Sequence, residues 1–284
     1  MNKKYYSLDD YCDLMNKKIV TTDIQAYINY PKYNFVYNKL ELCKSQNIPC
    51  APMGIQPIKY PVVFKPVYNL YGMSRSFYKI YNKEDYHKYL KDGLFWMPYY
   101  SGNQINLDVI YDNDKIVFYS ALTSIPNNEG TFISHSSNTK YKISKKIEYW
   151  IHKNMKGYRG PLNMEIIQDN IIEVHLRLNG DFHLYDPEFV GQYIDFLEKK
   201  TDTIEYKIPN ISIFPLFINK DEIKSYNEKK DGFLNYLNRD KKVITFTEYD
   251  LESLSQSHQL RALMIELEDY EHGKLLIDIL KNQL

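Results

Sequence analysis

A short apolar stretch carries four side chains whose types and spacing suit chemistry: Glu165, Glu173, His175 and Arg177. The residues around them are β-prone on both sides of a polar trio at positions 168 to 170, which is typical of a hairpin turn. Side chains alternate between the two faces of a strand, so Glu173, His175 and Arg177 share one face. With the trio as the loop, Glu165 lies directly across from Glu173.

Two carboxylates on paired strands repel each other, and like charges placed in this way destabilise a sheet. A divalent cation between them would reverse the sign of that interaction, and a set of oxygen ligands suits Mg²⁺. We therefore interpret Glu165 and Glu173 as candidate metal ligands. The alternative is a surface hairpin with solvated charges, and a small shift in strand register would separate the two carboxylates.

A second candidate site begins with a lysine in a short apolar strand at residues 60 to 66. Lys65 is costly inside such a strand unless its ammonium group meets an anion, although a residue near a strand end can also reach solvent. The loop that follows contains Gly72, Ser74 and Ser76. Such a loop can offer backbone N–H groups to a phosphate, and a plain hairpin loop is the alternative.

The composition narrows the class of protein. The chain has 284 residues, 44% of them hydrophobic and 25% charged, with a formal net charge of zero. These values are typical of a globular protein, and the charge balance argues against a protein whose main task is to bind nucleic acid. Three unclustered cysteines suit a reducing compartment, and no segment has the length of a membrane span. We expect a cytoplasmic protein without a membrane anchor.

The elements that must position these residues are read from hydrophobic spacing and turn signals. Residues 34 to 47 show a helical stripe with Lys39 near its start, and residues 17 to 30 have the β-branched residues of a short strand. Residues 123 to 141 are polar and are interpreted as a loop. The tail is predicted to have its own helices and strands, at 221 to 239, 243 to 247, 261 to 267 and 273 to 284.

Taken in order, residues 34 to 195 resemble an ATP-grasp protein. The resemblance rests on the order and spacing of several motifs. They are Asn38-Lys39 at a helix start, Ile48-Pro49 after that helix, Pro61-Val-Val-Phe-Lys65-Pro66, the loop from Gly72 to Ser76, Met97-Pro-Tyr-Tyr-Ser-Gly102, Asn163-Met-Glu165 and Glu173-Val-His-Leu-Arg177.

The resemblance implies an α+β fold in which two lobes clamp a nucleotide, with a small α/β appendage at the C-terminal end. The boundaries it suggests are 1–60 for a short N-terminal region, 61–97 for the small lobe, 98–195 for the large lobe with the metal hairpin, and 196–284 for the appendage. The part before residue 34 is shorter than the α/β domain that usually precedes the clamp. A second copy of the chain or a partner protein is therefore a candidate to supply that surface.

The resemblance also implies roles for individual residues. Lys39 and Lys65 would contact the nucleotide, and the loop with Gly72, Ser74 and Ser76 would cover its β- and γ-phosphates. The hinge whose backbone reads adenine would include Trp96, Met97 and Tyr99. The metal ligands would be Glu165, Glu173 and His175, and the catalytic candidates are Arg177 and His175, with Arg177 near the transferred phosphate.

The implied reaction is ATP-dependent ligation of a carboxylate to an amine through an acyl phosphate, with ATP and Mg²⁺ as cofactors and release of ADP and phosphate. The substrates would be small molecules or peptides. Two alternatives remain: a nucleotide-binding regulator or scaffold without ligase activity, and a kinase that uses the same clamp. One departure from the pattern bears on this choice. The family's last motif usually reads Glu-x-Asn-x-Arg, and His175 replaces the Asn, which suggests another metal, a hydrogen-bonding or structural role, or lost activity.

Overall fold

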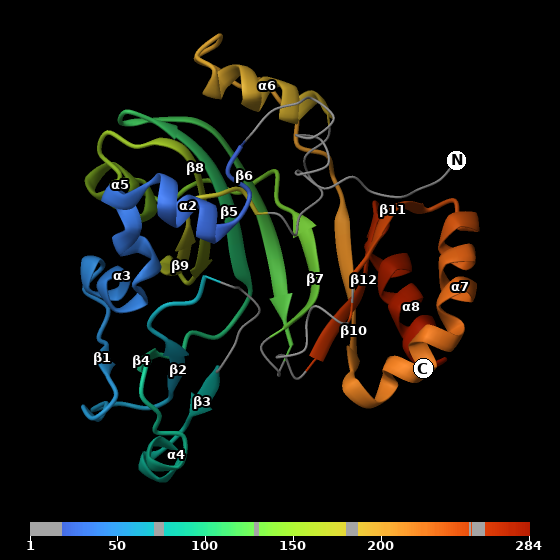
Figure 1. Ribbon diagram of the computed structural model, residues 1–284, viewed down its shortest axis with the longest axis horizontal. Helices are drawn as coiled ribbons and strands as arrows, with labels where there is room; N and C mark the ends of the chain where they lie inside the picture. Colours follow the sequence, from blue (N-terminus) through green and yellow to red (C-terminus); the bar gives the residue numbers. More distant parts are fainter. Residues whose placement is uncertain (1–18, 71–76, 128–130, 180–186, 250, 252–258) are drawn as a thin grey trace.

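The computed structural model describes residues 19–70, 77–127, 131–179, 187–249, 251 and 259–284. Within these residues the chain forms a small and a large antiparallel sheet, each with helices packed beside it (Figure 1). The predicted α+β class is therefore confirmed. In the same residues no helix combines the length and the apolar character needed to cross a membrane.

The small sheet lies at one end of the molecule, in the strand order β1-β4-β2-β3 (Figure 1). Helix α4 (Lys83–Lys88) packs against one side of it and begins after Asn82, whose side chain accepts a hydrogen bond from the backbone of Asp85 at 2.8 Å. The buried residues of this lobe are apolar or aromatic, and they include Phe64 and Tyr86. The four strands are β1 (Ala51–Pro52), β2 (Val62–Pro66), β3 (Tyr78–Ile80) and β4 (Leu94–Pro98).

The large sheet has eight strands in the order β11-β12-β10-β7-β6-β5-β8-β9. Its strands are β5 (Gln104–Asp112), β6 (Lys115–Pro126), β7 (Phe132–Ser137), β8 (Arg159–Ile167), β9 (Asn170–His175), β10 (Ser212–Asn219), β11 (Val243–Glu248) and β12 (Gln259–Leu267). One face carries an apolar core with α5 (Lys145–Asn154), and part of the opposite face packs against α6 (Pro187–Leu197). The rest of that opposite face is polar and includes the glutamate hairpin.

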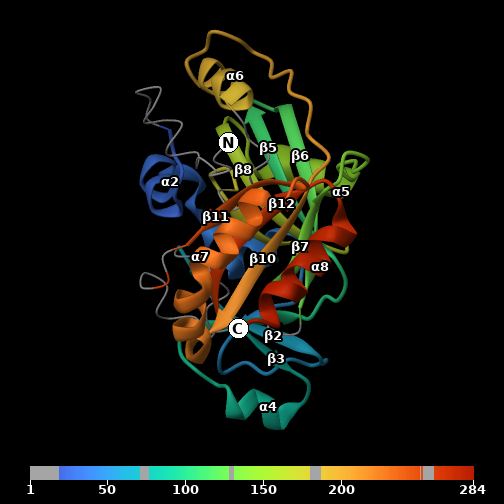
Figure 2. The same ribbon diagram turned by 90° about the vertical axis from the view of Figure 1, so that its right-hand side faces the viewer.

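The C-terminal segment forms the two helices and two strands that the sequence predicts, together with β10, which was not predicted, and its strands continue the large sheet. Ser212 and Ile213 of β10 pair with Ser136 and His135 of β7. The helices α7 (Ile223–Arg239) and α8 (Tyr270–Lys281) pack beside β10, β11 and β12 (Figures 1 and 2), and a short 3₁₀ helix, η2 (Lys220–Glu222), precedes α7. Backbone hydrogen bonds thus make the C-terminal segment part of the large sheet.

Gly273 of α8 lies in close contact with β10, and this contact gives a stability prediction. A Cβ atom at this position would lie 2.3 Å from Cε2 of Phe214, whose ring is buried. Gly273→Ala should therefore lower the free energy of unfolding by about 1–3 kcal/mol, because overpacking outweighs the better helix propensity of Ala. Urea unfolding measures the change. Gly232→Ala in α7 is the matched control, since a Cβ there meets nothing within 4 Å; equal effects of both substitutions would contradict the packing argument.

The N-terminal segment differs from the prediction in two places. The described part of the predicted strand, residues 19 to 30, contains no strand: α2 (Asp23–Asn29) begins with a capping box in which Thr22 and Gln25 bond to each other's backbone. The helix predicted over residues 34 to 47 is divided at Asn38 into a 3₁₀ helix, η1 (Pro31–Tyr37), and α3 (Lys39–Ser45). The division follows from capping, because the Asn38 side chain accepts hydrogen bonds from Leu40 and Glu41.

The loop predicted over residues 123 to 141 is wrong for most of its length. β6 extends to Pro126, and β7 pairs with it from Phe132 to Ser137. Polar residues mark this region because they lie on the polar face of the sheet. Ser124 and His135 are buried there, and the Ser124 Oγ and His135 Nδ1 atoms are 2.6 Å apart.

Candidate functional site

The hairpin of β8 and β9 places the two glutamates opposite each other. Gln168 and Asp169 form the turn with φ angles of 51° and 58°, which are typical of a type I′ hairpin. Glu165 pairs with Glu173, as the sequence predicts, but the turn length and the strand register differ from the prediction. The turn has two residues instead of three, and a register shift between Glu165 and Ile166 restores the pairing.

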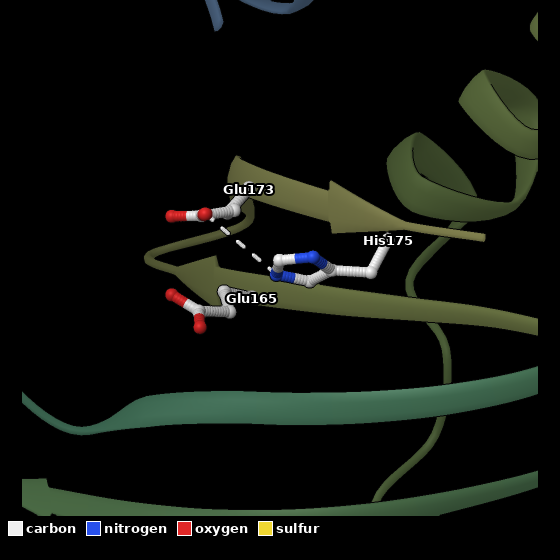
Figure 3. A group of neighbouring side chains, drawn as sticks. All are labelled: Glu165, Glu173 and His175. Atoms are coloured by element: carbon white, nitrogen blue, oxygen red, sulfur yellow. Dashed lines mark ion pairs between the residues drawn. The ribbon is translucent and has the colours of Figure 1, made fainter. Parts of the chain in front are cut away.

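His175 joins the two carboxylates on the same face. The potential ligand atoms of Glu165, Glu173 and His175 all lie within 4.8 Å of one another. Figure 3 shows the imidazole pointing toward the carboxylates, with Nε2 3.7 Å from Oε1 of Glu173. The three predicted metal ligands therefore form one cluster.

One lysine contacts this cluster, and a second, from another element, interacts with it electrostatically. Lys39 lies at the first position of α3 and is only 5% exposed, and its Nζ atom is 2.8 Å from Oε1 of Glu173. Lys65 lies near the end of β2 in the small lobe. Burial lowers the pKa of Lys65, as does the nearby charge of Lys39, while Glu173 and Glu165 act in the opposite direction. Side chains from both lobes thus interact electrostatically at one place.

The two glutamates have different acidities. Burial alone would raise the pKa of Glu173, but Lys39, His175 and Lys65 outweigh it and bring that pKa to about 2. Burial raises the pKa of Glu165, and the charge of Glu173 raises it further. Glu165 is therefore the carboxylate with the greater need for additional positive charge.

The raised pKa of Glu165 gives a prediction for the substitution Glu165→Gln. The raised pKa of Glu165 means that the folded state binds its proton more tightly than the unfolded state, so ionisation of Glu165 costs stability as pH rises above its ordinary value of 4.5. Without metal, Glu165→Gln should raise the melting temperature at pH 7, and the gain should shrink as pH falls toward 4.5. Melts of both proteins in EDTA across this range test it. If Glu165→Gln melts at a lower temperature than the wild type at pH 7, the surrounding positive charges already compensate the charge of Glu165.

Asp23 is a component of the site that the sequence analysis did not identify. It is 4% exposed, and its Oδ1 and Oδ2 atoms lie 3.0 Å from Nδ1 of His175 and 2.9 Å from Nη2 of Arg177. Burial alone would raise the pKa of Asp23, but His175 and Arg177 outweigh it and bring that pKa to about 2. The capping box at Thr22 was a usable signal for the helix, but nothing in the sequence marks Asp23 as a partner of His175.

The predicted hinge residues lie on and just after β4. Trp96 pairs with Ala51 on one side and Phe64 on the other, and its indole N–H donates to the carbonyl of Ile55 at 2.6 Å. Met97 is 1% exposed and packs between the small lobe and the hairpin. The backbone N–H of Tyr99 donates to Pro61, so this group is already occupied. Gly72, Ser74 and Ser76 lie outside the described residues.

A row of buried polar side chains continues the site across the sheet. Asn106 of β5 pairs directly with Glu165. Its Nδ2 donates to Ser124 Oγ at 2.5 Å, and its Oδ1 accepts a hydrogen bond from Gln104 at 3.0 Å. Through Ser124 the row reaches His135 on β7. The polar face of the sheet is therefore held in place by hydrogen bonds around the glutamates.

Comparisons with known proteins identify solved structures with a similar fold. No family model matches the chain, and no curated protein matches its sequence. Solved structures do match. The L-amino acid ligase from Bacillus licheniformis is 11% identical with a TM-score of 0.58, covering 96% of this chain and 75% of that chain. The carboxyaminoimidazole ribonucleotide synthase from Aspergillus clavatus, complexed with ATP, is 10% identical with a TM-score of 0.61, covering 87% and 72%.

A third similar structure is the biotin carboxylase domain of the Hydrogenobacter thermophilus 2-oxoglutarate carboxylase, in complex with MgADP, ADP and bicarbonate. It is 14% identical with a TM-score of 0.53, covering 82% of this chain and 62% of that chain. At these identities the similarity establishes the fold alone. The two-sheet architecture described above is the ATP-grasp fold.

Proposed function

We propose that the chain is an ATP-dependent ligase that joins a carboxylate to an amine. The observation that carries this proposal is the ion pair between Lys39 and Glu173 beside Glu165, with Lys65 close enough for both glutamates to raise its pKa. Phosphoryl transfer requires little covalent help from the protein but much fixed charge of both signs around the phosphates and their metal ion. These four side chains provide that combination. The solved structures with this fold include an L-amino acid ligase, which agrees with the proposal.

The donor set fits a divalent cation. Glu165 and Glu173 are paired carboxylates with too little positive charge around Glu165, and a cation between them would relieve their repulsion. Glu165, Glu173 and His175 would hold the ion. When bound, such an ion neutralises the phosphate oxygens of ATP and orients them for transfer. Lys39 and Lys65 would add positive charge at the nucleotide, and Arg177 would act on the transferred phosphate.

The proposed reaction balances without a further reactant. A carboxylate oxygen of the first substrate attacks the γ-phosphorus of ATP, the bond to the β-phosphate oxygen breaks, and ADP leaves. The amine then attacks the carbonyl carbon of the acyl phosphate, inorganic phosphate leaves, and an amide forms with loss of one proton from the amine. The substrates are small molecules or peptides that carry these two groups.

An isotope experiment tests this chemistry directly. The chain is incubated with ATP, a divalent cation and a panel of amino acids and short peptides, and ADP release identifies an active pair. The carboxylate of that pair is then labelled with ¹⁸O. The proposal predicts that one ¹⁸O atom appears in inorganic phosphate and that hydroxylamine, used in place of the amine, yields a hydroxamate. ADP release with unlabelled phosphate would contradict the acyl phosphate route.

A second candidate function is a nucleotide-binding regulator or scaffold without ligase activity. Two observations favour it: His175 stands where the family pattern has Asn, and Lys39 is engaged in an ion pair with Glu173. On this account ATP binds but no carboxylate and amine pair releases ADP. The labelling experiment separates the two functions, because a regulator would bind ATP and transfer no oxygen.

A further inference from the structure

Asp23 contacts the ring nitrogen of His175 that faces away from Glu173. The Nδ1 atom of His175 lies 3.0 Å from Oδ1 of Asp23, and their side chains are 6% and 3% exposed. An ionised carboxylate only accepts hydrogen bonds, so the ring nitrogen that faces it must carry the hydrogen. In the neutral ring this leaves the lone pair on Nε2, which is the atom that points toward Glu173 at 3.7 Å.

Asp23 is itself held by further donors. Tyr37 donates from its hydroxyl group to Oδ1 of Asp23 at 3.2 Å, and Nη2 of Arg177 donates to Oδ2 at 2.9 Å. The Tyr37 hydroxyl in turn accepts a hydrogen bond from the backbone N–H of Leu176 at 3.1 Å. Tyr37 and Arg177 therefore orient the Asp23 carboxylate, and this carboxylate fixes the tautomer and the direction of the neutral His175 ring.

This arrangement is the usual support of a metal-binding histidine. Histidines that ligate metals donate their second ring N–H to a carboxylate, a carbonyl or water, which fixes the tautomer and makes the ligand more basic. An imidazole nitrogen is a good ligand for first-row transition ions, whereas Mg²⁺ prefers oxygen. The cluster therefore has one nitrogen and two carboxylates at a position where oxygen donors alone would suit Mg²⁺.

We propose that Asp23 is a positioning residue that makes His175 a nitrogen ligand, and that the cluster takes a divalent transition ion such as Mn²⁺ in preference to Mg²⁺. The inference deepens the proposed function, because the same cluster would hold the ion that accompanies ATP. On this inference, His175 in place of the Asn of the family motif changes which metal ion binds but does not abolish metal binding.

Pulsed electron paramagnetic resonance of the Mn²⁺-loaded protein tests the nitrogen ligand without any turnover. The whole chain is produced with ¹⁴N or with ¹⁵N confined to histidine, and each sample receives MnCl₂ with and without ADP. The inference predicts a ¹⁴N coupling to Mn²⁺ that becomes a ¹⁵N coupling in the labelled protein. His175→Asn should remove it, and His152→Asn on α5 is the control that should retain it. Because the labelled wild type is decisive alone, a poorly folded variant does not weaken the test.

Affinity provides the second readout. Mn²⁺ should bind at least about tenfold more tightly than Mg²⁺ in competition titrations, in line with the preference of mixed nitrogen and oxygen sites. His175→Asn should reduce this ratio about tenfold, because the nitrogen donor is lost. Asp23→Asn should weaken Mn²⁺ binding about 10- to 100-fold, as is typical when the partner of a ligating histidine is lost.

The possible outcomes separate this inference from the proposed function. Bound Mn²⁺ without a histidine coupling, or equal affinity for the two ions, overturns the inference while ATP-dependent ligation stands. A histidine coupling with Mn²⁺ but no ADP release for any substrate pair supports the inference and contradicts the ligase. Failure of Mn²⁺ to bind with or without ADP overturns the inference as well.

Discussion

Glu173→Gln is expected to reduce metal-dependent ATP binding by about two orders of magnitude or more and to leave the fold intact. Even the loss of an outer partner of a metal ligand costs 10- to 100-fold in affinity, and Glu173 is proposed as a ligand itself. Gln has nearly the same shape and can still accept a hydrogen bond from Lys39, which now lies 2.8 Å from Oε1 of Glu173. Isothermal titration with ATP and MnCl₂ or MgCl₂ measures the effect.

The matched control is Glu41→Gln, because Glu41 lies on the same helix as Lys39 and forms an exposed ion pair with Lys44 at 2.9 Å. That substitution should leave the affinity unchanged. If Glu173→Gln binds ATP and metal as tightly as the control, the hairpin glutamates are not metal ligands.

Asp23→Ala is expected to have the largest effect on stability, a loss of about 3–5 kcal/mol in the free energy of unfolding. The substitution leaves His175 and Arg177 without the carboxylate that both contact, and His175 is 5% exposed. Urea unfolding at pH 7 measures the loss. Asp195→Ala is the control, because its exposed ion pair with Lys200 should contribute only about 0–1 kcal/mol. Equal, small losses would show that Asp23 does not hold the site together.

The pH dependence of the Asp23 contribution has a defined sign. The pKa of Asp23 is about 2 in the folded protein, below its ordinary value of 3.8. Its stabilisation is therefore fully present above pH 3.8 and is lost as pH falls through about 2. The difference between wild type and Asp23→Ala should shrink over this acidic range and stay constant near neutral pH.

The hairpin was predictable because its signals are local. Alternating residues and a polar turn place Glu165 and Glu173 opposite each other, and the pairing survives although the turn is shorter than expected. The register shift between Glu165 and Ile166 was not predictable. A three-residue turn without a shift and a two-residue turn with a shift both place Glu165 opposite Glu173. Local pattern therefore determined which residues meet but not the backbone path.

The contribution of Asp23 was not predictable because it depends on contact between distant parts of the chain. Asp23 and His175 are 152 positions apart. The β-branched residues around Asp23 favour a strand, and the capping box of Thr22 and Gln25 outweighs them. The loop prediction for residues 123 to 141 was wrong for a related reason. Polar residues usually indicate a loop, but Ser124 and His135 are buried in strands, in the hydrogen-bonded row beside the glutamates.

Thermal melts of the wild-type chain test the central claim, that the two lysines and the hairpin glutamates form a metal–nucleotide site. The protein is melted alone, with ATP in EDTA, and with ATP plus MnCl₂ or MgCl₂. A ligand that binds only the folded state adds about 2.7 kcal/mol at a hundredfold excess over its Kd. The account predicts an upward shift of the melting temperature that requires both ATP and the divalent ion. The same shift with ATP in EDTA, or no shift in any sample, would contradict it.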